Sequence, residues 1–301
     1  MSLFPLFKIL ISAKVDMAGP AVRKVRLGDL PRKATFMYHS IADHQTLMSS
    51  FADLVRHTRL IGEHWQGRGW NAKADVCFTF DDGYVSALEP VRWLAAEGYR
   101  VIVFLPVVSA GVRYLPKDML RIVMERLPQG ERLRVGRLDL RLSCRTPYSR
   151  AMLAFRINRH LMQTCTLCEY ADAMRAVESE YRVLLDAPCR ELMLMRAEDV
   201  RILQQDFPNV EIGAHGSMHY RFDRLGTDHE IKKEVVAPGI ELGQSFNTDV
   251  VGLAYPYGFV SDRIEAVARS HYEWAYVADP VGGPGNHRMP RVGLDGVRLV
   301  P

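Results

Sequence analysis

The stretch Phe78-Thr79-Phe80-Asp81-Asp82-Gly83 is the most informative part of the chain. The apolar pattern before the two acids predicts a strand over Val76–Phe80, so the two carboxylates follow its carboxyl end on a tight turn. Adjacent carboxylates repel each other, and each raises the other's pKa unless a cation or a hydrogen-bond donor intervenes. We therefore expect a metal at one aspartate and a proton-transfer task at the other. The alternative is a solvated Asp-Asp-Gly turn.

Strand and helix patterns alternate on both sides of this stretch. Repeated strand–helix units predict an α/β protein with a parallel sheet, open or closed into a barrel. In either architecture the chemistry gathers at the carboxyl ends of the strands, where His39, Asp81, Asp82, His215 and Tyr257 all fall. The predicted strands are 34–38, 76–80, 101–105, 210–214, 250–254 and 274–277, and the predicted helices are 47–61, 85–97, 197–206, 228–244 and 261–270.

The alternation stops between about residues 112 and 189. This segment shows no clear strand, contains little Gly, Ser or Pro, and has helical patterns at 151–162 and 170–185, so we predict a helical insertion and not a linker. The remaining organisation is an N-terminal extension, 1–33, and one domain, 34–301, that carries the insertion.

The insertion also carries the basic excess of the chain. Ten arginines lie between Arg121 and His160 against Glu125, Glu131 and Asp139, a net charge of +7. One interpretation is a solvated helical surface. The other is a face for an anionic glycan, a lipid-linked pyrophosphate or an anionic membrane surface.

Composition sets broad limits on the protein. With 301 residues, 48% of them hydrophobic, and a net charge of +4, the chain predicts a globular protein with a sizeable core and no nucleic-acid partner. Its five cysteines, an odd count, argue against a disulfide framework. The apolar start, 1–11, is short and is interrupted by Lys8. We therefore expect no secretory signal, no transmembrane helix and a cytoplasmic location, with peripheral membrane association left open.

His215-Gly-Ser-Met-His219 spaces two imidazoles by four residues. On one helical turn this spacing would bring both rings within reach of one ion. Imidazole suits zinc, cobalt, nickel or iron, and a carboxylate completes a facial set with open positions. An isolated pair of this kind is more often two surface histidines on a turn. The Asp81-Asp82 pair at a comparable strand end reverses that preference.

Three motifs together resemble a known family. Thr79-Phe80-Asp81-Asp82-Gly83, His215-Gly-Ser-Met-His219 and Ala254-Tyr-Pro-Tyr-Gly258 are similar, in order, to the first three motifs of the polysaccharide deacetylases, carbohydrate esterase family 4. Phe36-Met37-Tyr38-His39-Ser40 also resembles the opening strand of the exopolysaccharide-modifying members. The resemblance spans about 34–277, with the insertion as an interruption.

The resemblance implies a distorted (β/α) barrel that hydrolyses an N-acetyl group on a sugar of a polysaccharide or lipid-linked glycan. Asp81 would be the general base, the backbone N–H of Tyr257 an oxyanion donor, and a divalent metal, usually zinc, would be the cofactor. The implied metal ligands are Asp82, His215 and His219. Tyr255 and His39 are candidates for substrate contact, and His39 could instead support the metal site or act as an acid.

Two departures from the family pattern leave roles unassigned. Ala254 stands where an arginine usually orients the catalytic aspartate, so Arg288 or Arg291 is the candidate replacement, and both are also candidates for substrate binding. The usual Leu-x-His of the general acid is missing, and His287 is the nearest candidate. Two alternatives stay open: a metal-dependent amidase acting on a non-sugar C–N bond, and a weakly catalytic glycan-binding component of polysaccharide assembly.

Overall fold

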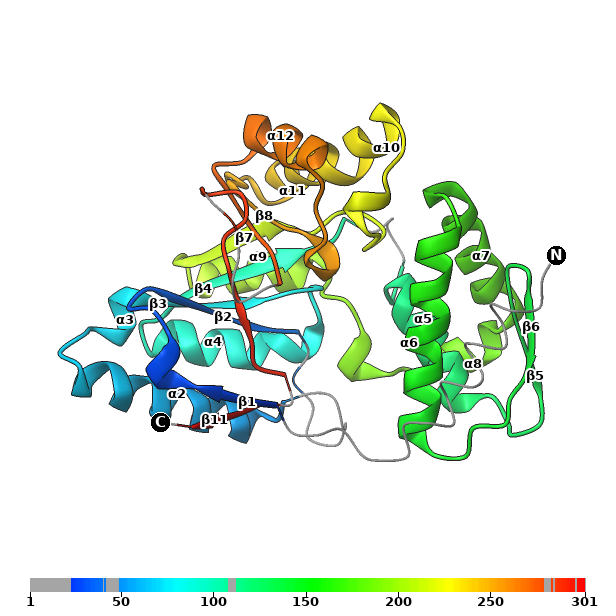
Figure 1. Cartoon of the computed structure of the whole chain (residues 1–301), viewed down its shortest axis with the longest axis horizontal. Helices are drawn as coiled ribbons and strands as arrows, with labels where there is room; N and C mark the ends of the chain where they lie inside the picture. Colours follow the sequence, from blue (N-terminus) through cyan, green and yellow to red (C-terminus); the bar gives the residue numbers. More distant parts are fainter. Residues whose placement is uncertain are drawn as a thin grey trace. The chain divides into compact units, whose positions relative to one another are not determined.

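The computed structural model describes residues 23–39, 41, 49–107, 112–278, 283, 285–295 and 297–300 (Figure 1). The chain divides into two compact units. The insertion unit contains Tyr114–Cys189, and the barrel unit contains Val22–Arg113 and Arg190–Pro301. Our predictions for the apolar start, 1–11, and for the first two residues of the helix at 47–61 fall on residues outside those described.

A seven-stranded parallel sheet forms the centre of the barrel unit and curls into a distorted half-barrel, as predicted. Its strand order is β10-β2-β3-β4-β7-β8-β9. Because all neighbouring strands are parallel, their carboxyl ends lie along the same rim. The strands are β2 (Ala34–Tyr38), β3 (Val76–Phe80), β4 (Arg100–Leu105), β7 (Val210–Ala214), β8 (Gly252–Ala254), β9 (Trp274–Tyr276) and β10 (Val292–Gly293).

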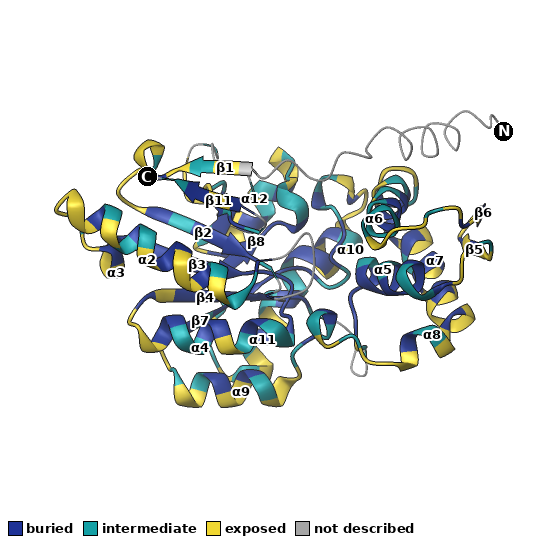
Figure 2. Ribbon diagram, turned by 90° about the horizontal axis from the view of Figure 1, so that it is seen from below, coloured by how far each residue is buried: buried dark blue, intermediate teal, exposed yellow. Residues whose placement is uncertain are grey.

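Helices connect these strands, and their outward faces are exposed while the strands are buried (Figure 2). The α-helices are α2 (Phe51–Gly67), α3 (Ala72–Asp75), α4 (Leu88–Ala96), α9 (Ala197–Asp206), α10 (Asp228–Ile231), α11 (Ala237–Phe246) and α12 (Asp262–His271). Short 3-10 turns are η1 (Leu27–Asp29), η2 (Val85–Ala87), η3 (Arg190–Leu192), η4 (Phe222–Arg224) and η6 (Pro256–Gly258), and η5 (Lys232–Val236) is a π-helical turn. Ser261 caps α12, as its sequence predicts, because its side chain accepts from the backbone N–H of Ile264.

The segment 289–293 contacts both β9, at one edge of the sheet, and β2, near the other. Met289 bridges Tyr276 of β9, and Val292 and Gly293 form β10, which pairs with β2. The segment therefore extends the curl of the sheet from β9 back towards β2. As a result Arg291, between these two pairings, points into the barrel and has no exposed surface.

Structure begins earlier than the predicted boundary at residue 34. The strand β1 (Arg23–Arg26) pairs in parallel with β11 (Val297–Val300), and the turn η1 (Leu27–Asp29) follows it. Residues 23–33 therefore belong to the barrel unit, and an extension ending at residue 33 is wrong at that boundary. No sequence pattern indicates this pairing, because each strand has only four residues and the partner lies at the other end of the chain.

The insertion unit contains a β-hairpin as well as helices, which corrects the prediction of a segment without strands. Arg132–Val135 (β5) pairs with Leu138–Arg141 (β6) around a two-residue turn in which Gly136 has a positive φ of 56°. Both strands alternate buried apolar with exposed residues, but four residues are too few for a clear pattern. The helices are α5 (Pro116–Arg126), α6 (Pro147–Thr164), α7 (Leu167–Glu180) and α8 (Arg182–Asp186).

Several arginines of the insertion unit have internal partners. Arg150 donates to the carbonyls of Met124, Glu125 and Leu127 at the end of α5, where the helix leaves carbonyls without intrahelical partners. Arg126 donates to the carbonyls of Leu184 and Ala187. Part of the net charge of +7 therefore serves the fold of this unit.

Two further predictions concern bonds and membrane spans. The structure places all five cysteines as free thiols. Within the described ranges, no helix has both the length and the apolar character needed to cross a membrane.

Candidate metal centre and active site

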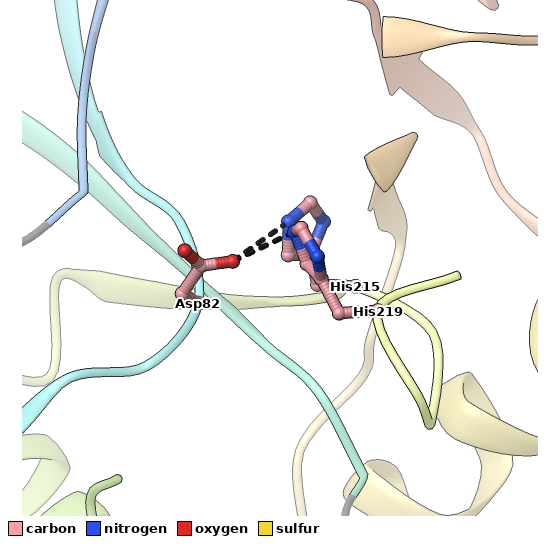
Figure 3. A group of neighbouring side chains, drawn as sticks. All are labelled: Asp82, His215 and His219. Carbon is pink, nitrogen blue, oxygen red and sulfur yellow. Dashed lines mark ion pairs between the residues drawn. The ribbon is translucent and has the colours of Figure 1, made fainter. Parts of the chain in front are cut away.

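Asp82, His215 and His219 meet at the carboxyl rim of the sheet (Figure 3). Asp82 follows β3 and His215 follows β7, and Figure 3 shows the Asp82 carboxylate facing both imidazoles. The Nε2 atoms of His215 and His219 lie 3.4 and 2.9 Å from Oδ1 of Asp82. All three residues are buried, and one potential ligand atom from each lies within 4.8 Å of the others.

The donor set fits a divalent cation of the zinc type. The Nδ1 atom of His215 is 2.8 Å from the carbonyl of Ala254 and donates to it, which leaves the lone pair of Nε2 directed at Asp82. This Nε2 atom is buried and has no hydrogen bond among the described residues. A buried imidazole nitrogen without a donor, beside a second imidazole and a carboxylate, is the arrangement that N/O-coordinated metals require.

The histidine pair does not lie on a helical turn, contrary to our expectation. Residues 215–219 form an irregular loop after β7, in which Gly216 and His219 have positive φ values of 75° and 50°. These left-handed conformations fold the loop back, so that the two ring centroids are 4.9 Å apart. The proximity expected from the spacing is present, but a different backbone produces it.

Asp81 has a different environment from its neighbour Asp82. Arg291 donates to both of its carboxylate oxygens, at 2.6 and 2.8 Å, and also to the hydroxyl of Thr79 at 3.2 Å. Burial alone would raise the pKa of Asp81, but the charge and hydrogen bonds of Arg291, with the charge of His215, hold it below the ordinary value. Asp81 is therefore ionised at neutral pH and 3.9 Å from His215.

Arg291 makes the contact with Asp81 that an arginine at position 254 was expected to make. Of the two arginines that the sequence suggested for this role, Arg291 contacts Asp81. Arg288 instead pairs with Glu265 and Asp262 of α12. Because Arg291 has no exposed surface, the structure gives no support to substrate binding by its side chain.

Tyr257 lies on the turn η6 after β8, and its ring is next to that of His219. The ring centroids of Tyr257 and His219 are 4.5 Å apart. Tyr257 has φ 60° and ψ 4°, and Gly258 follows with φ 76°. A Cβ atom at Gly258 would approach the backbone nitrogen of Ala278 to 2.6 Å, so glycine is required there.

Backbone strain concentrates at this site. Among the described residues, four that are not glycine have a positive φ: Asp82, His219, Tyr257 and Asn247. Asn247 ends α11, where asparagine is a common left-handed cap. The other three carry the candidate site, and strained backbone of this kind, costing about 1–3 kcal/mol per residue, clusters at functional positions.

His39 follows β2 and forms an ion pair with Asp295. Its Nδ1 atom is 2.6 Å from Oδ2 of Asp295, and its side chain keeps 37% of its surface exposed. Burial lowers the pKa of His39, but the hydrogen bond and charge of Asp295, with the charges of Asp82 and Asp81, raise it to about 9. His39 is thus a protonated, accessible imidazolium at neutral pH.

The structure does not bring His287 or Tyr255 to these groups. His287 donates through Nε2 to the carbonyl of Tyr272, at the amino end of β9, which is the opposite end of the sheet from the triad. Tyr255 has no exposed surface and packs against Phe222, so it cannot touch a substrate in this conformation. The structure therefore supports neither the acid role of His287 nor substrate contact by Tyr255.

Asp295 is the residue that the sequence did not point to. It lies 256 positions from His39, in a short turn before β11 with no motif around it. Only the pairing of β10 with β2 brings the two side chains together.

Cavity volume does not identify the site. A cavity of about 640 Å³ opens at the amino ends of the strands, lined by Ala34, Val76 and Arg100, whereas one of about 180 Å³ opens beside Asp82. In parallel α/β folds the chemistry lies at the carboxyl ends, where the ionisable groups of this chain converge.

Comparisons with known proteins add the following findings. No protein-family model matches the chain, and no curated protein matches it. Several solved structures of polysaccharide deacetylases are similar to it. BC0361 of Bacillus cereus is 12% identical with a TM-score of 0.47, and the match covers 88% of this chain and 66% of that one, slightly under two thirds.

Two further deacetylase structures match over most of their length. The Streptococcus pyogenes deacetylase PplD is 11% identical with a TM-score of 0.49, covering 87% of this chain and 92% of that one. The deacetylase domain of BpsB from Bordetella bronchiseptica is 13% identical with a TM-score of 0.47, covering 89% and 97%. These likenesses are too distant to assign an activity, which we argue from the residues of the site.

Proposed function

We propose that this protein is a metal-dependent hydrolase that removes N-acetyl groups from an amino sugar in a polysaccharide or a lipid-linked glycan. The single observation that carries this proposal is the asymmetry of the two aspartates. Asp82 faces two imidazoles, while Asp81 is held ionised by Arg291 within 3.9 Å of His215. One carboxylate is thus arranged as a ligand and its neighbour as a base.

Asp82, His215 and His219 would hold the cation, for which we propose zinc. A divalent cation bound there supplies a Lewis acid, which polarises the acetyl carbonyl and acidifies the attacking water. Asp81 takes the proton of that water, and it can do so because Arg291 keeps it ionised and fixes both of its oxygens. Arg291 is in this scheme a positioning residue.

Tyr257 and His39 would serve the later stages. Tyr257 has a left-handed backbone and its ring lies 4.5 Å from that of His219, and its N–H would donate to the oxygen of the tetrahedral intermediate. One such donor is typically worth about 3 kcal/mol. His39, protonated through its bond to Asp295, would give a proton to the departing amine. This replaces His287 in the role of general acid.

A non-sugar amide is the alternative to the sugar substrate. The similarity of the motifs, including Phe36-Met37-Tyr38-His39-Ser40, to exopolysaccharide-modifying deacetylases favours a glycan. The same catalytic groups would also hydrolyse the C–N bond of a non-sugar amide. The base Asp81 and its fixing arginine favour either hydrolase over a weakly catalytic glycan-binding protein, which needs neither.

Acetate release tests this proposal. The purified protein, loaded with zinc, is incubated with N-acetylglucosamine oligomers of several linkages and with small N-acetyl amides that lack a sugar. We expect acetate from at least one oligomer. We also expect a loss of about 10²–10⁴-fold in Asp81→Asn, which should keep its zinc. Asp206→Asn, at the exposed end of α9, is the control and should behave as the wild type.

Each other result has a definite meaning. Turnover of the amides alone would replace the glycan with a non-sugar substrate. Undiminished release by Asp81→Asn would remove Asp81 as the base. A His215→Ala/His219→Ala variant with the same zinc content as the wild type would remove the metal site.

A further inference from the structure

Glu234 is a buried carboxylate that contacts the loop carrying His215 and His219. It has no exposed surface, and it lies in η5 between Ile231 and Val235, which are also buried. Its Oε2 atom accepts from the backbone N–H groups of Ser217, at 2.9 Å, and Met218, at 3.1 Å. These are two of the three residues between His215 and His219 in the sequence.

The loop needs an acceptor at this place because it is not helical. The left-handed residues Gly216 and His219 fold it back, so the N–H groups of Ser217 and Met218 have no partner in a regular element. A buried backbone donor without a partner costs about 1–3 kcal/mol. Glu234 satisfies both donors with one oxygen, and burial raises its pKa, but Oε2 accepts in either protonation state.

The fit between Glu234 and the loop is close. A Cβ atom at Gly216 would lie 3.2 Å from Oε2 of Glu234 and 3.1 Å from the ring of Phe222, so the carboxylate packs directly on that glycine. The hydroxyl of Ser217 adds a second tie to the same turn by donating to the carbonyl of Lys233 at 3.2 Å.

The chain is also shaped to deliver Glu234 to this position. Pro238 has no N–H, so it cannot donate to the carbonyl of Glu234 four residues earlier, as an α-helix requires. The helix opens into the π-helical turn Lys232–Val236 before α11 begins. The missing hydrogen bond at Pro238 is thus accommodated by this wide turn, which has Glu234 at its centre.

The two ligand positions of the loop are fixed by different means. His215 is held by the sheet: its N–H donates to the carbonyl of Leu105, and its Nδ1–H donates to that of Ala254. Glu234 fixes the stretch that continues from there to His219. A hydrophobic residue would be a less costly filler for this space than a carboxylate, since burying an ionisable group is expensive unless its bonds offset the cost.

We propose that Glu234 is a positioning residue that sets the place of His219 relative to His215 and Asp82, and hence the metal affinity of the site. This inference rests on the proposed function for the presence of a metal. Outer groups that orient metal ligands typically contribute 10- to 100-fold in affinity. We expect zinc dissociation constants to rise up to about 10-fold in Glu234→Gln, which retains an acceptor, and about 10- to 100-fold in Glu234→Ala.

The experiment measures zinc affinity by competition with a chelator. It also measures the free energy of unfolding by denaturant, once with zinc present and once with chelator present. Glu230→Gln is the matched control, because Glu230 also accepts backbone N–H groups, those of Gly226 and Thr227, but at the exposed start of α10. We expect this control to keep the zinc affinity of the wild type. We expect Glu234→Gln to be destabilised more in zinc than in chelator, and the visible spectrum of its Co²⁺ form to differ from that of the wild type.

A destabilisation of equal size with and without zinc, together with unchanged zinc affinity, would overturn the proposal and make Glu234 a purely structural residue. A Glu234→Gln variant that does not fold in chelator would do the same, because the residue would then be a requirement of the fold. If the wild type itself binds no zinc, the proposed function fails first, so the two failures are distinguishable.

Discussion

Replacing Arg291 with methionine should strongly destabilise the barrel unit. The substitution removes two hydrogen bonds to Asp81, at 2.6 and 2.8 Å, from a place with no exposed surface. At about 1.5–3 kcal/mol for each bond to a charged group, the loss is about 3–6 kcal/mol. Removing one partner of a buried ion pair independently gives about 3–5 kcal/mol. We therefore expect the free energy of unfolding at pH 7 to fall by about 3–5 kcal/mol.

The pH dependence gives this prediction a second signature. In the wild type the pKa of Asp81 is depressed, so its contribution to stability is present above the ordinary aspartate pKa and is lost as the pH falls through the folded-state value. In Arg291→Met the buried carboxylate has lost its cation, and its pKa rises because charge is costly there. Protonation relieves that cost, so the difference between the two proteins should shrink as the pH falls from 7 towards 4.

Denaturant unfolding at several pH values, read by fluorescence, is the assay. Arg288→Met is the control, because Arg288 pairs with Glu265 and Asp262 at a partly exposed position, where an ion pair is worth about 0–1 kcal/mol. The variant Asp81→Asn/Arg291→Met should be more stable than Arg291→Met, because it carries no unpaired charge. The reasoning is refuted if Arg291→Met loses no more stability than Arg288→Met, or if its loss is the same at every pH.

Two further predictions concern the rim of the barrel. The alkaline limb of the acetate-release rate should lie near the pKa of His39, about 9, because the acid must be protonated. Asp295→Asn should move that limb to lower pH, and an unmoved limb would exclude His39. Gly258→Ala and Gly69→Ala both place alanine at a similar positive φ, 76° and 69°, so each should cost about 1 kcal/mol of stability. Gly258→Ala should lose more stability than Gly69→Ala and should also reduce acetate release, because its added Cβ atom meets the backbone of Ala278. Equal effects of the two substitutions on stability and activity would contradict the role of that turn.

The repeated strand and helix patterns were enough to predict the parallel sheet and its functional rim. Strands such as Val76–Phe80 and Val210–Ala214 were predicted with their observed bounds, because each is a short, mostly apolar run followed by polar residues. The short pairs β1–β11 and β5–β6 were missed. Their strands have only four residues, and the β1–β11 pairing depends on a partner at the far end of the chain.

The grouping of the three candidate metal ligands was predictable for a related reason. His215 and His219 are neighbours in sequence, and Asp82 follows a strand, so local spacing and strand order together place all three on one rim. The backbone that joins the two histidines was not predictable. Gly216 and His219 have positive φ values, and Gly216 packs against Phe222 and Glu234, a contact that the spacing of the two histidines does not encode.

Sequence alone was enough to predict the class of fold and the meeting of Asp82, His215 and His219 at one rim, because these follow from local patterns and from the rule that parallel strands end together. Which aspartate would be the ligand and which the base was implied by the family resemblance. Only the tertiary structure decided what surrounds them. Arg291 reaches Asp81 across 210 positions, and Asp295 reaches His39 across 256. Such pairs leave no periodic trace in a single sequence, since their contact energy arises only when the sheet curls and brings β10 beside β2. The same curl leaves His287 at the opposite end of the sheet.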